Sequence, residues 1–230
     1  MENLRYEFFE DSVARITLDD GKANVMSVPM FEQLTEALDD AERDNARLVV
    51  FAGRSGMFSG GLDLRLMPTL SPAGLGTLSR EFARTMLRIY AFPAPTVAAI
   101  TGHAIAGGAI MALACDVRVA ADGPFRFQVN EVAIGIPVPS WMGMIAMTGI
   151  PHGHHTEAIL HARAYSPREA LSCGIVHALA EQGRNVVELA GETCRHLSML
   201  APTAYAETKR RIRAADVARV LTLLEDELPG

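Results

Sequence analysis

The stretch 102–116, GHAIAGGAIMALACD, constrains the fold more than any other part of the chain. A short apolar strand runs into the adjacent glycines Gly107 and Gly108 and then becomes an apolar helix. Because glycine has no side chain, a ligand can approach the backbone there, and the free N–H groups of the first helical turn point out of the helix end. The stretch therefore predicts either a place that holds negative charge or, more simply, a tightly packed strand–turn–helix corner.

A second segment of the same kind lies upstream. The apolar run 48–51 predicts a buried strand, because it is continuous rather than alternating, and it ends at Gly53. The segment 56–64, GMFSGGLDL, then predicts a strand that gives way to glycines and a short helix. Two such units before residue 116 predict repeated βα units and an α/β core.

The rest of the chain gives a coarse secondary structure. Alternating apolar residues predict an N-terminal hairpin, and Ser27 is a predicted cap for the helix that follows it. The stretch 68–76, rich in Pro, Gly and Ser, predicts a mobile loop. Beyond residue 137 the chain is predicted to be helical, with a capping box at Ser166 and Glu169. The predicted strands are 4–9, 13–18, 48–51, 95–100 and 117–121, and helices are predicted within 27–41, 78–89 and 184–228.

Length and charge narrow the class of protein. The chain has 230 residues, which fits one large domain, and 49% of them are hydrophobic, enough for a full core. A formal charge of −6 argues against a protein that binds nucleic acid regardless of sequence. The charged N-terminus lacks the apolar core of a signal peptide, and no run reaches the length of a membrane span, so we expect a cytoplasmic protein without membrane binding. The clustered basic residues predict a solvated helix face: Lys209, Arg210, Arg211 and Arg213.

Cysteines and histidines give no strong metal or disulfide pattern. The three cysteines are odd in number and lie among apolar residues, which predicts buried thiols: Cys115, Cys173 and Cys194. His152, His154 and His155 crowd together without a cysteine or carboxylate at ligand spacing. We therefore predict a polar surface there and no metal site.

Three motifs together carry a resemblance to a known family. The run 102–108, the segment 58–64 and the pair Asn130 and Glu131 occur in the order and spacing that resemble the crotonase (enoyl-CoA hydratase/isomerase) superfamily. The match extends from the first strands to about residue 213. It implies an α/β, ClpP-like fold of stacked ββα turns, a superhelix with C-terminal helices. The implied division is a core domain over 1–200 and a shortened helical trimerisation segment over 201–230.

The resemblance also implies partners. Members of the superfamily act on acyl-CoA thioesters and usually assemble as homotrimers or as hexamers built from two trimers. Coenzyme A would enter as part of the substrate, so no separate cofactor is expected. By the same resemblance the thioester oxygen would accept hydrogen bonds from the backbone N–H groups of Leu62 and Gly107. Donors fixed in advance stabilise the negative charge that forms on that oxygen.

Contacts to coenzyme A are implied for the loop Lys22, Ala23, Asn24 and Val25 and for the backbone of Ser59, Gly60 and Gly61. Arg65 follows the first glycine motif, where many relatives carry a basic residue, and a guanidinium suits phosphate. On the sequence alone, Lys22 and Arg65 are equally well explained as surface charges.

A departure from the family pattern bears on the reaction. Hydratases of the superfamily use two glutamates to activate water, and the first of these positions is Ile110 here. The second is present as Glu131, among apolar neighbours that would raise its pKa. This pattern is similar to the Δ3,Δ2-enoyl-CoA isomerases, in which one carboxylate removes a proton at C2 and returns one at C4. Glu131 is therefore the predicted general base and acid, the alternative being a surface glutamate beside a strand.

Other side chains are candidates for the acyl pocket, although ordinary core packing explains each of them as well. The candidates are Leu66, Met67, His103, Ile110, Trp141 and Met142. Other functions stay open on the same scaffold. They are weak hydration, decarboxylation or hydrolysis, also on carrier-protein thioesters, and a non-catalytic acyl-CoA-binding role.

Overall fold

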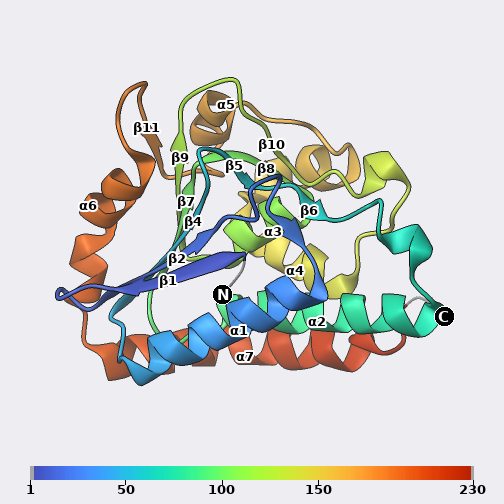
Figure 1. The fold of residues 1–230 in the computed structure, drawn as a ribbon, viewed down its shortest axis with the longest axis horizontal. Coiled ribbons are helices and arrows are strands. Elements are labelled where there is room, and N and C mark those ends of the chain that lie inside the picture. The colour runs from blue at the N-terminus through green and yellow to red at the C-terminus, as the bar shows by residue number, and fades with distance from the viewer. Residues whose placement is uncertain (1–2, 229–230) are drawn as a thin grey trace.

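The computed structural model describes residues 3–228 and is built around a six-stranded sheet in the order β1-β2-β4-β7-β9-β11 (Figure 1). The pair β1 and β2 is antiparallel, and every later pair in this sheet is parallel. Two small parallel sheets, β10-β8-β5 and β3-β6, lie beside it. The strands are β1 (Leu4–Phe8), β2 (Val13–Leu18), β3 (Val25–Met26), β4 (Leu48–Gly53), β5 (Gly56–Ser59), β6 (Gly61–Leu62), β7 (Thr96–Ile100), β8 (Gly102–Ile105), β9 (Val117–Ala121), β10 (Phe127–Gln128) and β11 (Ala178–Ala180).

Helices cover both faces of the large sheet. One face packs on α6, and the other packs on α1, α2 and α3 in the main core (Figure 1). Alternate residues of β4 divide between the faces, since Val50 points to α6 while Phe51 belongs to the main core. The α-helices are α1 (Val28–Arg43), α2 (Pro72–Tyr90), α3 (Gly107–Ala114), α4 (Ser140–Gly149), α5 (Pro167–Ser172), α6 (Val186–Ser198) and α7 (Pro202–Leu224). None of the helices within residues 3–228 is long and apolar enough to cross a membrane.

Local sequence signals predicted several of these elements correctly. The hairpin is present, with Leu4 opposite Leu18, and the buried strand β4 ends at Gly53 as expected. Ser27 caps α1 by accepting a hydrogen bond from the N–H of Met30 at 3.4 Å. The capping box at Ser166 is also present. In each case the residues that interact lie within about one helical turn or one hairpin of each other in the sequence. These elements could therefore be predicted from local sequence alone.

Two predictions of secondary structure are wrong. The stretch 68–76 is not a loop throughout, because α2 begins at Pro72, where proline suits the first helical turn and the Ser71 hydroxyl accepts from the N–H of Gly74 at 3.2 Å. The region after residue 137 is not entirely helical, because β11 pairs with β9 as a parallel edge strand. A strand of three residues is too short to produce a readable alternation.

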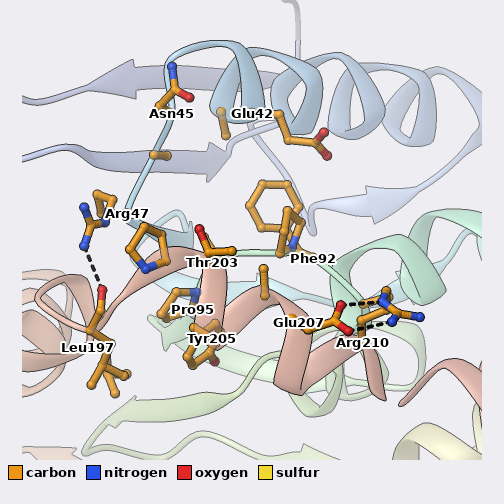
Figure 2. A pocket seen from close by; sticks show the side chains of 18 residues that line it. Glu42, Asn45, Arg47, Phe92, Pro95, Leu197, Thr203, Tyr205, Glu207 and Arg210 are labelled. Atoms are coloured by element: carbon orange, nitrogen blue, oxygen red, sulfur yellow. Dashed lines mark hydrogen bonds and ion pairs between the residues drawn. The ribbon is translucent and has the colours of Figure 1, made fainter. Parts of the chain in front are cut away.

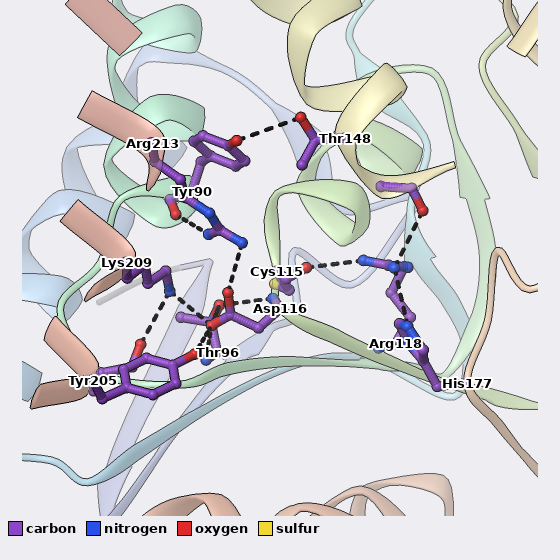
Figure 3. A network of polar contacts seen from close by, with 12 residues as sticks. Tyr90, Thr96, Cys115, Asp116, Arg118, Thr148, His177, Tyr205, Lys209 and Arg213 are labelled. Atoms are coloured by element: carbon purple, nitrogen blue, oxygen red, sulfur yellow. Dashed lines mark hydrogen bonds and ion pairs between the residues drawn. The ribbon is translucent and has the colours of Figure 1, made fainter. Parts of the chain in front are cut away.

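The prediction that the four basic residues of α7 form a solvated helix face is correct for only two of them. Arg210 and Arg211 are exposed and pair with Glu207. Lys209 is only 4% exposed and donates to Asp116 at 2.7 Å, and Arg213 pairs with the same carboxylate at 2.9 Å (Figure 3). The helix face was misjudged because the partner lies more than ninety residues away in the sequence. These contacts fasten α7 to the end of the large sheet.

The thiols and imidazoles are placed much as the sequence suggested. Cys115 and Cys194 are buried as predicted, whereas Cys173 is half-buried. His152 is exposed, and its neighbours His154 and His155 are partly exposed. Within residues 3–228 no group of three His, Cys, Asp or Glu side chains converges as a metal site would require.

Candidate active site

A cavity of about 620 Å³ joins the two glycine motifs to the segment that carries Glu131. Its walls come from β6, the start of α3, the helices α2 and α4, and the residues after α7. Residues predicted from the sequence to be functional line it together: Gly60, Leu62, Met67, Gly107, Glu131, Trp141 and Met142. Segments that lie far apart in the chain therefore meet at one site.

The start of α3 is built by close packing and backbone strain. A Cβ on Gly108 would lie 2.2 Å from the carbonyl oxygen of Ser59, so β5 can approach the helix only because residue 108 is glycine. Ala106, just before the helix, has φ 51° and ψ −125°, a conformation that costs about 1–3 kcal/mol for a residue with a side chain. Such strain is concentrated at functional sites, and here it aims the first turn of α3 into the cavity.

The first glycine motif lies against this helix end. Gly61 has φ +82°, and a Cβ there would lie 2.8 Å from the backbone nitrogen of Gly107. The next residue, Leu62, pairs with Met26 in the short β3-β6 ladder. As the first residue of α3, Gly107 has no intrahelical acceptor for its N–H. The backbone of Leu62 and that of Gly107 thus border the same cavity, as an oxyanion site requires.

Glu131 is a buried carboxyl at the cavity wall. It is 5% exposed, and its Oε2 has no hydrogen-bond partner among the described residues. Burial raises the pKa of Glu131 to about 7. The adjacent Asn130 also presents a buried, unpartnered oxygen, Oδ1. A carboxyl group with a pKa near neutrality can both accept and release a proton, which suits general base and acid catalysis.

The pairing of β10 with β8 explains how Glu131 reaches this position. Gln128 lies opposite Ile105, and its carbonyl accepts from the N–H of Ala106 at 2.8 Å. Three residues later the chain passes the start of α3, and a short 3-10 turn over Val132–Ile134 follows. The small sheet therefore fixes the carboxyl beside the helix end.

The loop proposed to contact coenzyme A is organised by a residue that the sequence reading overlooked. Both carboxylate oxygens of Asp20 accept backbone N–H groups, from Lys22 at 2.7 Å, Asn24 at 2.8 Å and Val25 at 2.9 Å. These bonds lower the pKa of Asp20, against the opposing effect of its partial burial. An aspartate before a glycine turn is a common signal for such a loop. The run 19–24, DDGKAN, therefore could have predicted that Asp20 organises it.

Two residues assigned to coenzyme A have side chains that point into the protein. Asn24 is fully buried and donates to the carbonyls of Leu18, Met57 and Phe58 at 3.0–3.1 Å. Ser59 is also buried, and its hydroxyl donates to the carbonyl of Asn24 at 2.7 Å. Their side chains hold the loop against β5, so only their backbone is left for a ligand. Lys22 and Arg65 are exposed.

The apolar part of the cavity has a rigid aromatic wall. Phe82 stacks on Phe31 with ring centroids 5.3 Å apart and meets Trp141 edge-on at 4.9 Å. Three residues assigned to the acyl pocket lie outside the cavity. Ile110 is fully buried in the core, Leu66 is 41% exposed, and His103 Nδ1 accepts from the N–H of Arg126 at 3.1 Å.

Other lining residues were missed, namely the segment Ile136–Pro139 and the chain after α7. Residues 136–139 lie between Glu131 and Trp141, in the run whose resemblance pointed to Glu131, but they were not themselves assigned to the site. The residues after α7 reach the cavity through contacts with distant residues, namely Arg80 and Ser140.

A second hollow, of about 750 Å³, lies between the end of α1 and the start of α7 (Figure 2). None of the predicted site residues lines it. Its arginines are engaged within the protein, since Arg47 donates to the carbonyl of Leu200 at 2.7 Å and Arg210 pairs with Glu207. It offers no buried carboxyl comparable to Glu131.

The chain is similar to known proteins over most of its length. A family model described as enoyl-CoA hydratase/isomerase matches residues 8–226. A putative enoyl-CoA hydratase of Thermus thermophilus is 35% identical over 207 residues, 88% of this chain and 81% of that protein. Human mitochondrial enoyl-CoA delta isomerase 1 is 30% identical over 213 residues, 91% of this chain and 70% of that protein.

A solved structure has a similar fold. The crystal structure of human mitochondrial Δ3-Δ2-enoyl-CoA isomerase matches with a TM-score of 0.93 at 29% identity, covering 98% of this chain and 89% of that one. Hydratases and isomerases both occur among these similar proteins. The reaction has to be argued from the residues in the cavity.

Proposed function

Because this chain belongs to the enoyl-CoA hydratase/isomerase family, we propose that it isomerises 3-enoyl-CoA thioesters to 2-enoyl-CoA thioesters, with Glu131 as the only proton carrier. Its fold is the α/β crotonase fold that the motifs predicted. The observation that carries the proposal is the buried carboxyl of Glu131 at the cavity wall, whose Oε2 has no hydrogen-bond partner within residues 3–228. The position where hydratases carry their other glutamate is Ile110, which is fully buried.

The proposed reaction has two proton transfers. The Glu131 carboxylate takes the C2 proton, and the electron pair of that C–H bond moves toward the thioester carbonyl to give a dienolate. The negative charge on the thioester oxygen accepts hydrogen bonds from the N–H groups of Leu62 and Gly107. The protonated Glu131 then donates to C4, the double bond moves from C3–C4 to C2–C3, and the carboxylate is regenerated.

The pKa of Glu131 suits both steps. A pKa of about 7 leaves a substantial fraction ionised at neutral pH and makes the protonated form a usable acid. Glu227 also lines the cavity, but its carboxylate accepts hydrogen bonds from Ser140. Among the described residues lining the cavity, Glu131 is therefore the carboxyl available for proton transfer.

The proposal is tested by mixing dialysed protein with a 3-enoyl-CoA and following the absorbance of the conjugated thioester. Glu131→Gln should lose between about 100-fold and 10,000-fold in kcat while keeping its affinity for acyl-CoA. Hydration is followed separately as loss of the conjugated absorbance of a 2-enoyl-CoA. Hydration faster than isomerisation, or a fully active Glu131→Gln variant, would refute the proposal. Binding without any turnover would indicate an acyl-CoA-binding protein.

We also propose that the chain assembles as a homotrimer or as a hexamer of two trimers. Exposed apolar side chains on α7 and just before it support an assembly, since Met199 is 74% exposed and Ile212 is 68% exposed. Light scattering coupled to size-exclusion chromatography gives the mass directly. A monomer at micromolar concentration would contradict this proposal.

A further inference from the structure

The last residue of α7 and the residues that follow it form part of the cavity wall. We call residues 224–228 the C-terminal strap. Leu224, Glu227 and Leu228 all line the cavity. Leu224 is 4% exposed and Leu228 is partly buried against the main core. The strap therefore contributes two apolar side chains to a site whose other walls lie far away in the sequence.

One anchor ties the strap to α2. The Arg80 guanidinium donates from Nε and Nη2 to the two carboxylate oxygens of Glu225, both at 2.9 Å. A paired arrangement of this kind fixes direction as well as distance. Arg80 stands beside Ser79 and within one turn of Phe82, and both of these line the cavity. The anchor thus holds the strap at the part of α2 that faces the ligand.

A second anchor ties the strap to α4. The residue before this helix is Pro139, whose side chain provides no cap. Glu227 supplies the cap, because its carboxylate accepts from the backbone N–H of Ser140 at 2.8 Å and also from the Ser140 hydroxyl. A negative charge is favourable at a helix N-terminus. The next two residues of α4, Trp141 and Met142, line the cavity.

The strap thus closes the apolar side of the site, where α2 and α4 face each other. The backbone N–H groups at the start of α3 and the Glu131 carboxyl lie on the other side of the cavity. On the strap side the polar lining residues are Ser79 and Glu227, and the Glu227 carboxylate accepts hydrogen bonds from Ser140. With the thioester carbonyl at Leu62 and Gly107, the acyl group extends toward Phe82 and Trp141. The nucleotide and pantetheine parts of coenzyme A are too polar for that wall.

We propose that the C-terminal strap ends the acyl part of the cavity, and that Leu224 and Leu228 set the longest acyl group that the protein accepts. The proposal rests on the proposed function only in that the ligand is an acyl-CoA. It does not depend on which reaction follows.

Binding of saturated acyl-CoA thioesters tests the proposal without requiring turnover. Trp141 is the only tryptophan of the chain and lines the cavity, so its fluorescence reports binding directly. Across the series from butanoyl-CoA to hexadecanoyl-CoA, each added methylene should tighten wild-type binding about fourfold until the strap is reached. Beyond that length the affinity should level off or fall.

Two opposite substitutions at Leu228 should move this limit in opposite directions. Leu228→Ala should admit longer chains and gain at least about tenfold in affinity just beyond the wild-type limit. Leu228→Phe should shorten the limit, while butanoyl-CoA binding stays within about twofold in both variants. Leu221→Ala is the matched control, because Leu221 lies on α7, is 41% exposed and does not line the cavity.

Circular dichroism shows whether each variant is folded. If Leu228→Phe does not fold, the chain-length profile of Leu228→Ala alone tests the role of the strap. Chain-length profiles identical to wild type in the folded Leu228 variants would overturn the role of the strap. Failure of the wild-type protein to bind any acyl-CoA would overturn it as well. A shifted limit in a protein without isomerase activity would support the strap and refute only the proposed reaction.

Discussion

The burial of the Glu131 carboxyl lowers the stability of the fold and supports the catalytic role that we propose for it. Its carboxyl is buried, one of its oxygens lacks a partner within residues 3–228, and its pKa is raised to about 7 from an ordinary 4.5. Ionising it in the folded protein is therefore harder than in the unfolded chain. The same property keeps a proton available near neutral pH. Sites of this kind commonly give up stability for activity.

The cost should be visible as a pH-dependent free energy of unfolding. Below pH 4.5 Glu131 is protonated in both states and imposes no penalty, whereas between 4.5 and about 7 the unfolded state ionises first and stability falls. As the pH rises from 4 to 8, we expect the free energy of unfolding of Glu131→Gln to increase relative to that of wild type by up to about 3 kcal/mol. Urea unfolding at both pH values measures this gain.

The exposed Glu36 on α1 provides the matched control for this measurement. Glu36→Gln should leave the shape of the stability curve unchanged. Parallel curves for wild type and Glu131→Gln across this range would mean that the carboxyl is not penalised by burial, and would remove the physical basis for its role as a proton shuttle.

The contact between β6 and α3 brings together the two backbone N–H groups, those of Leu62 and Gly107, that we propose as oxyanion donors. Gly61 tolerates φ +82°, and its missing Cβ leaves the Gly107 nitrogen accessible. Gly61→Ala should therefore displace the start of α3 and lower kcat about 100-fold, the usual loss when one oxyanion donor is misplaced. Acyl-CoA affinity should change much less than kcat. Steady-state kinetics with a 3-enoyl-CoA and a binding titration separate the two effects.

Gly183 provides a control for backbone strain alone. It has φ +87°, but a Cβ there would meet nothing within 4 Å. Gly183→Ala should cost about 1–2 kcal/mol of stability and leave kcat unchanged. Equal kcat losses in the two variants would show that the approach of β6 to α3 has no special part in the reaction.

The sequence predicted those elements whose signals are local. The hairpin, the cap at Ser27 and the capping box at Ser166 are each specified within a few residues. The glycine motifs and Glu131 were found because their order along the chain is distinctive, and the structure brings them to one cavity. What they do there stays a prediction.

Long-range partners could not be read from the sequence. Glu227 accepts a hydrogen bond from Ser140, which is 87 residues away in the sequence, and Lys209 donates to Asp116, which is 93 residues away. No local sequence pattern identifies either partner. Ile110 and His103 were expected in the acyl pocket because they belong to the central motif. Their strand and helix turn them away from the cavity, which depends on packing rather than on spacing.

The docking of α7 on the sheet helps to position the C-terminal strap, because the strap continues from the end of this helix. Asp116 holds the helix in place (Figure 3). It accepts hydrogen bonds from the Thr96 N–H at 2.8 Å and the Tyr205 hydroxyl at 2.9 Å, and it pairs with Lys209 and Arg213. One nearly buried carboxylate therefore neutralises two cations of α7.

This asymmetry predicts unequal effects of removing each partner. Asp116→Asn leaves Lys209 and Arg213 without a counterion and should destabilise the protein by about 3–5 kcal/mol at pH 7. Lys209→Met leaves Asp116 paired with Arg213 and should cost clearly less. The exposed pair of Arg210 with Glu207 is the control, and Arg210→Ala should cost at most about 1 kcal/mol. Chemical denaturation of the four proteins gives these values.

The effect of Asp116→Asn should also depend on pH. Lys209 and Arg213 lower the pKa of Asp116 below its ordinary 3.8, although burial acts in the opposite direction. The stabilisation is therefore complete above pH 3.8 and disappears as the pH falls through the lowered folded value. The stability gap between wild type and Asp116→Asn should narrow in that acidic range. A gap that stays constant into strong acid, or a loss from Lys209→Met as large as that from Asp116→Asn, would mean that shape rather than charge holds α7 to the sheet.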